Sequence, residues 1–179
     1  MSAAKNLAIQ PSLYYNTGYA GSFARQIDAT CASDATVQGS VFGKLSGHKL
    51  SQAQQAWEIG CSEASYAANY AATSLGVSTP ASWWADIETG NSWSTNTILN
   101  QFALDGMSYF MSTKGGGGFY SSPAMWAKIT GSSSWDTTPA MAGSWVAGTK
   151  VCAGATLGGT AAWLVQGGTS GGLDQDTAC

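Results

Sequence analysis

Short apolar or aromatic runs alternate along the chain with longer segments of helical periodicity. The strand-like runs are residues 12–16, with a further apolar run at 7–11 just before them, and then 81–88, 116–122, 143–149, 160–168 and 172–179. Strands that alternate with helices in this way are typical of βαβ units and a mostly parallel sheet. The pattern therefore predicts an α/β fold.

Three of the intervening segments carry helix signals. The longest, 50–76, has a capping pattern at Ser51 and ends at Gly76. The second, 94–116, repeats apolar residues every three to four positions, and we expect Asp105 on its solvated side. The third, 122–131, opens with a capping serine and a proline in its first turn. The Gly/Ser-rich stretch that contains Cys31 is predicted to be a loop.

Composition narrows the class of protein. With 179 residues, one domain covering 1–179 is expected. Charged residues make up 9% of the chain, against about 25% in average soluble proteins, so Ser, Thr, Gly, Asn and Gln must cover most of the surface, as in exported proteins. The net charge is −3 and Arg25 is the single arginine, which argues against nucleic acid as a partner.

The four cysteines allow three disulfide pairings, and free thiols are the alternative. We expect neighbours in the chain to pair, so that each bridge closes a loop of about 30 residues and contributes about 3 kcal/mol. The paired residues would be Cys31 with Cys61 and Cys152 with Cys179.

The sequence shows no signal peptide, membrane span, metal site or nucleotide site. The first residues lack the apolar stretch of a signal peptide, so a secreted protein would need a leader upstream or another export route. No run of 18 apolar residues could span a membrane. With a single histidine, His48, and no Cys-x-x-Cys spacing, neither a metal nor another cofactor is expected. The glycine run at 115–118 precedes a strand and lacks nucleotide-binding spacing.

The segment "SWWADIETGNSW" (82–93) carries the candidate chemistry. Asp86 and Glu88 are two residues apart, so on a strand they share a face and lie about 6.6 Å apart along the backbone. Strand ends of this kind hold the sites of parallel α/β proteins. Mutual repulsion and the adjacent tryptophans should keep a proton on at least one of the two acids, as hydrolysis of a glycosidic bond requires.

The spacing of the two acids does not distinguish a retaining from an inverting glycosidase, because it spans both ranges of carboxyl separation. A purely structural role for the two acids also stays open. In that role Asp86 and Glu88 form a buried hydrogen-bonded pair, or a cation site, that only organises the loops.

A longer series of motifs resembles a known family. In order along the chain they are "WWADIETGNSW", "GGGFYSSPAMWAKITG", "SWVAG", "AWLVQ" and "GLDQD". They resemble successive strands of lysozyme-like family 25 glycoside hydrolases, particularly the secreted actinobacterial relatives with a D-x-E-x-GNSW signature. The resemblance runs from about residue 11 to the C-terminus.

The resemblance implies a (β/α) barrel of the TIM type, secretion, and cleavage of the peptidoglycan glycan between N-acetylmuramic acid and N-acetylglucosamine. It implies Glu88 as the proton donor, and Asp86 as its electrostatic partner or as the group that orients the substrate acetamide. The residues that it places around the substrate are Tyr15, Trp84, Tyr120, Gln166, Asp174 and Asp176.

The chain departs from the family at its start, because the family's barrels have two further strands, one with another aspartate, before the equivalent of "SLYYNT". We therefore expect an incomplete barrel of about six strands with two unpaired edges. Three explanations stay open: a truncated chain, a partner chain or second copy that covers the edges, or a reduced fold that closes differently.

Two further functions stay open beside the hydrolase. The first is a non-catalytic carbohydrate-binding protein that has kept the aromatic residues without the chemistry. The second is a structural protein that self-assembles through its sheet edges, for which the low charge would suit close packing.

Overall fold

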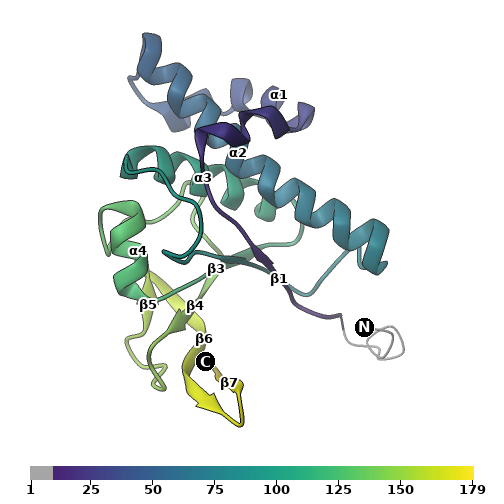
Figure 1. Cartoon of the computed structure of the whole chain (residues 1–179), viewed down its shortest axis with the longest axis vertical. Coiled ribbons are helices and arrows are strands. Elements are labelled where there is room, and N and C mark those ends of the chain that lie inside the picture. The colour runs from purple at the N-terminus through teal and green to yellow at the C-terminus, as the bar shows by residue number, and fades with distance from the viewer. Residues whose placement is uncertain (1–9) are drawn as a thin grey trace.

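The structure is a computed structural model that describes residues 10–179 (Figure 1). Residues 7–9 of the apolar run at 7–11 therefore lie outside the described residues.

The chain folds around one mostly parallel sheet. Five strands lie parallel in chain order: β1 (Leu13–Asn16), β2 (Trp83–Asp86), β3 (Gly117–Ser121), β4 (Gly143–Ala147) and β6 (Thr160–Ser170). Two more strands pair antiparallel to β6: β5 (Thr156–Leu157) and β7 (Leu173–Ala178). The predicted α/β class is confirmed, with seven strands in residues 10–179 where about six were expected.

Within residues 10–179 the sheet is open. There β1 pairs with β2 alone, whereas β6 at the other end is covered by β5 and β7. A closed barrel is thus not formed by the part of the chain that the structure describes.

The helices connect successive parallel strands. Between β1 and β2 lie α1 (Ala29–Val37) and α2 (Gly47–Tyr70), with the short helices η2 (Gly21–Gln26), η3 (Gly39–Phe42) and η4 (Ala71–Leu75). The following connections contain α3 (Thr97–Thr113) and α4 (Pro123–Thr130). Right-handed crossovers between strands in sequential order place their helices on one face. Figure 1 shows α1, α2 and α3 gathered on one side of the sheet.

The core lies between that face and the helices. The strands contribute every second residue to it, including Trp83, Ala85, Phe119, Val146 and Val165, and the helices contribute Ala64, Leu104, Met107, Trp126 and Ile129. This alternation of buried strand residues is typical of a sheet that has helices on one face.

Helix ends follow the predicted signals only in part. As predicted, α4 starts after Ser122, whose Oγ accepts a hydrogen bond from the backbone N–H of Met125, and it stops at Gly131. The predicted cap Ser51 is wrong, because α2 already begins at Gly47 and Ser51 lies inside it. Gly76 does end this region, in the left-handed conformation.

The predicted loop around Cys31 is also wrong, because the segment forms α1. The Asp28 side chain caps this helix by accepting a hydrogen bond from the backbone N–H of Thr30. The helix consists of small and polar residues and has no strong apolar stripe, so its periodicity gave no signal. It is held to α2 by a disulfide between Cys31 and Cys61, both fully buried.

The second disulfide joins Cys152, in the connection before β5, to Cys179 at the end of β7. The two bridges pair neighbouring cysteines, as expected. Disulfides persist mainly in oxidising compartments, and they are consistent with an exported protein. No helix within residues 10–179 combines the length and the apolarity needed to cross a membrane.

Helices α2 and α3 cross in backbone contact. A Cβ on Gly60 would lie 1.8 Å from the carbonyl oxygen of Ala103, and one on Gly106 would lie 2.0 Å from that of Trp57. Only glycine fits at both positions, so these two residues set the distance between the central helices.

The prediction that Asp105 is solvated is wrong. Its side chain is buried, and its Oδ1 accepts a hydrogen bond of 2.6 Å from the backbone N–H of Thr138. Both α2 and the loop before β4 pack against α3, which leaves little of α3 for water. Burial raises the pKa of Asp105 to about 7, the Thr138 bond opposes this rise, and the charge of Asp136 adds to it.

The protein should lose stability as pH rises from about 4 to about 7. The folded state holds the Asp105 proton more tightly than the unfolded state, so the stabilisation present below the unfolded pKa disappears as pH passes the folded pKa. By linkage this loss is at most about 4 kcal/mol. Asp105→Asn keeps an oxygen for the Thr138 N–H and removes the charge. It should therefore raise the free energy of unfolding at pH 8 and flatten its pH dependence, as measured by urea unfolding.

The matched control for this prediction is Asp174→Asn, which changes an exposed carboxylate on β7. An equal difference in stability between pH 5 and pH 8 for the native protein and Asp105→Asn would contradict the assignment.

Candidate functional site

The sheet has two chemically different faces. Leu13, Tyr15 and Trp83 point toward the helices and pack in the core. Because side chains alternate along a strand, Tyr14, Trp84 and their in-register neighbours point the other way. We call this second face the aromatic face; its residues are Tyr14, Trp84, Asp86, Gly118, Tyr120, Gly143, Trp145 and Gln166, with Trp163 packed on them.

Trp145 on β4 is the centre of the aromatic face. Its ring centroid lies 5.1 Å from that of Tyr120 and 5.9 Å from those of both Tyr14 and Trp84, all in edge-to-face geometry. Trp84 also contacts Trp163, at 6.1 Å. Tyr14 and Trp145 lie on strands that are three strand spacings apart, about 14 Å in a flat sheet, whereas their ring centroids are 5.9 Å apart.

Two glycines leave room for the indoles. A Cβ on Gly143 would lie 2.3 Å from Cδ2 of Trp163. A Cβ on Gly118 would lie 1.9 Å from the Gly143 carbonyl oxygen and 3.0 Å from Cζ3 of Trp84. The rings of Trp84 and Trp163 therefore lie directly on the backbone of β3 and β4, and Trp84 is buried as a result.

Asp86 and Glu88 lie at the carboxyl end of β2, on the same side as these rings. Asp86 is only 4% exposed, and its buried Oδ1 has no hydrogen-bond partner within residues 10–179. Burial raises the pKa of the Asp86 carboxyl, against the effect of hydrogen bonds from the side chains of Tyr14 and Asn91. Glu88 is less buried; its pKa is raised first by burial and then by the charge of Asp86.

The "GNSW" loop fixes the backbone that carries both acids. The Trp93 Nε1–H donates to the Glu88 carbonyl oxygen at 2.8 Å, and the Asn91 amide donates to that of Asp86 at 3.2 Å. From β3, the hydroxyl of Ser121 donates to the carbonyl oxygen of Ile87 at 2.7 Å. The motif that follows the acids is therefore a scaffold that holds Asp86 and Glu88 in place.

Tyr120 connects the acids of β2 with the C-terminal strands. Its hydroxyl donates to Oε1 of Gln166 at 2.6 Å. Burial raises the pKa of Tyr120 to about 12, and the nearby negative charges add to the rise; in order of effect they are Glu88, Asp174, Asp86 and Asp176. Carboxylates from β7 and from β2 thus surround one tyrosine.

Most of the predicted site residues come together here. The structure places these on the aromatic face or around Tyr120: Trp84, Asp86, Glu88, Tyr120, Gln166, Asp174 and Asp176. No three His, Cys, Asp or Glu side chains within the described residues are grouped so that they could hold a metal ion.

Tyr15 does not reach this site, which corrects the prediction. It points toward the helices, its hydroxyl is buried without a partner among residues 10–179, and its ring packs against Trp83. Tyr14 takes the expected place beside Asp86. In the parallel pairing of β1 with β2, Tyr14 stands opposite Trp84 and Tyr15 stands opposite Ala85. Knowledge of this register would have identified Tyr14 as the site residue.

Trp145 and Trp163 were missed as site residues. Each lies in a predicted strand, but a tryptophan in a strand can point to either face. The signal that could have located them is glycine: Gly118 and Gly143 are strand glycines, and such residues often mark close approach by another group.

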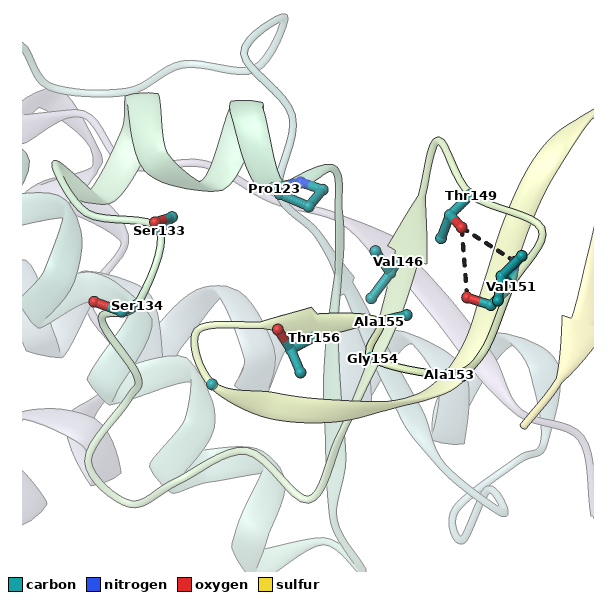
Figure 2. Close-up of a pocket in the computed structure, with 11 residues that line it drawn as sticks. Pro123, Ser133, Ser134, Val146, Thr149, Val151, Ala153, Gly154, Ala155 and Thr156 are labelled. Atoms are coloured by element: carbon teal, nitrogen blue, oxygen red, sulfur yellow. Dashed lines mark hydrogen bonds between the residues drawn. The ribbon is translucent and has the colours of Figure 1, made fainter.

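A pocket of about 510 Å³ lies away from the acids, on the helix side of the sheet. Figure 2 shows it between α4, which begins at Pro123, and the connection from β4 to β5. This connection contains no helix, so the space beside α4 is left unfilled. The lining is uncharged, with hydroxyls from Ser133, Ser134, Thr149 and Thr156. The lining contains no acid or base that could activate one of these hydroxyls, so the pocket is not the candidate for catalysis.

Comparison with known proteins adds no assignment: the chain matches no family model, no curated protein and no solved structure.

Gly118→Ala should destabilise the protein, because the new Cβ would meet the Gly143 backbone as well as the Trp84 ring. We expect a loss of about 2 kcal/mol or more in the free energy of unfolding, the usual range for overpacking, measured by urea unfolding. The control is Gly39→Ala, where a Cβ would meet nothing within 4 Å. Equal stabilities of the two variants would contradict the packing of the aromatic face.

Proposed function

We propose that the protein is a secreted glycoside hydrolase-like protein that acts on the glycan of bacterial peptidoglycan, with Glu88 as the general acid. The observation that carries this proposal is the position of Asp86 and Glu88. Both acids stand at the carboxyl end of a parallel strand, beside a face of aromatic rings, with raised pKa values. Flat aromatic rings are the surfaces on which sugar rings stack.

The two acids are suited to different roles. Glu88 is the more accessible, and a raised pKa keeps a carboxylic acid protonated for donation to the leaving oxygen. Asp86 is more buried, at 4% exposed. It would act as the electrostatic partner of Glu88 and stabilise positive charge at the reacting carbon.

The arrangement of the elements supports a fold of the (β/α) barrel type. Five parallel strands in sequential order, with helices on one face, are what an arc of such a barrel contains. In that fold the aromatic face would be the barrel interior, and the carboxyl ends of the strands would carry the site. The two disulfides support secretion.

Glu88→Gln should abolish release of soluble glycan from purified bacterial cell walls, or reduce it at least about 100-fold, because the amide cannot donate the proton. The native protein should work best in mildly acidic solution and lose activity as pH rises through the raised pKa of Glu88. The control is Glu58→Gln, which changes a carboxyl on α2. Equal release by the native protein and Glu88→Gln would exclude Glu88 from the mechanism.

A non-catalytic glycan-binding protein is the second candidate. It is favoured by two rings of the aromatic face that are about half exposed, Tyr14 at 49% and Trp163 at 47%. Trp163→Ala should then weaken retention on cell walls about fivefold, since stacking on an aromatic ring is of the order of 1 kcal/mol. The measurement is a cell-wall pull-down, and the control is Tyr70→Ala, which removes an exposed ring from α2.

The two candidates differ in one result. Retention by the native protein without any release of glycan would favour the binding protein. A failure of cell walls to retain either the native protein or Glu88→Gln would contradict both.

A further inference from the structure

The indole N–H of Trp145 has a fixed partner. Its Nε1–H donates to Oδ1 of Asp176 on β7 at 2.9 Å. Trp145 is also the ring that Tyr14, Tyr120 and Trp84 all contact. A change in the orientation of this one ring would therefore change the shape of the whole aromatic face.

The strand that supplies Asp176 is weakly held. Every residue of β7 is exposed, so burial of its side chains contributes little. Its ladder with β6 is interrupted by a register shift between Gln166 and Thr169. Beyond that ladder, Cys179 anchors the end of β7 in two ways: its backbone N–H donates to the Trp163 carbonyl oxygen at 2.8 Å, and its sulfur bonds to Cys152.

These contacts form a chain from the disulfide to the site. Cys152 lies in the connection after β4, the strand that carries Trp145, so the bridge ties β7 back to the same part of the sheet. Asp176 is only three residues from Cys179, and a short segment fixed at one end cannot move far at the other. The bridge thus restricts the position of the Asp176 carboxylate.

We propose that Asp176 is a positioning residue that holds the Trp145 indole as a platform for a sugar ring, and that the Cys152–Cys179 bridge keeps Asp176 in place. This inference rests on the proposed function for the part that concerns sugar. Asp176 acts here through Trp145 and does not need to touch the ligand.

Two substitutions separate the hydrogen bond from the charge. Asp176→Ala removes the acceptor, whereas Asp176→Asn keeps an oxygen acceptor and removes the charge. Gln175→Ala is the control, because it shortens an exposed side chain on the other face of the same strand. All variants are made in the Glu88→Gln background so that turnover cannot consume the ligand.

The first readout is hydrogen exchange of the Trp145 Nε1–H by NMR, with the resonance assigned by Trp145→Phe. We expect exchange at least about tenfold faster in Asp176→Ala, and rates within about twofold of the parent in Asp176→Asn and Gln175→Ala. The double variant Cys152→Ser/Cys179→Ser should also exchange faster at this indole and at the β7 amides. Unchanged indole exchange in Asp176→Ala would overturn the positioning role, and in the double variant it would overturn the role of the bridge.

The second readout is the affinity for a soluble oligosaccharide of alternating N-acetylglucosamine and N-acetylmuramic acid. We expect about tenfold weaker binding by Asp176→Ala and by the double cysteine variant, and little change in the other two. Faster indole exchange with unchanged affinity would overturn the platform. If the parent binds no oligosaccharide, the proposed function and the platform both fail, while the exchange rates still report whether Asp176 positions Trp145.

Discussion

The candidate chemistry depends on the fact that only one face of the sheet is covered by helices. Strand residues alternate, so every second side chain enters the core and the others form the aromatic face. The same alternation that buries Tyr15 and Trp83 places Tyr14, Trp84 and Asp86 together on the other side. Parallel register then aligns residues that are distant in sequence. No local motif could bring these groups together without that sheet.

On the face without helices, other groups must shield the strands from water. Here the rings of Trp84 and Trp163 pack against glycine positions of β3 and β4, and Trp145 and Trp163 contact Trp84 edge to face. At its far end the sheet is also covered by the short β5 and by β7 with two aspartates, which are common ways to block a sheet edge. The strand β1 has neither protection within the described residues and carries no charge. Within the described residues, the expected unpaired edge is therefore found at β1.

The sequence predicted what short-range patterns determine. The class of fold, the capped helix α4, the paired cysteines and the position of Asp86 on a strand all follow from local signals. The prediction that Glu88 shares that strand is wrong, because β2 ends at Asp86 and Glu88 lies two residues beyond it. The sequence missed what only packing decides. The helix α1 has small residues and is stabilised by its disulfide, and Asp105 is buried by a loop more than 25 residues away in the chain. Which of Tyr14 and Tyr15 meets Asp86 depends on register, which no local pattern contains.

A raised pKa does not by itself identify the site in this protein. Burial raises the pKa of Glu58, Glu63 and Asp105 as well as those of Asp86 and Glu88. The Asp105 carboxylate has a backbone N–H donor, so its environment is already satisfied by the fold. Asp86 differs, because one of its oxygens is buried without a partner while Glu88 and a set of aromatic rings stand beside it. A buried acceptor without a partner lowers the stability of the fold, so this position is one that stability alone does not explain.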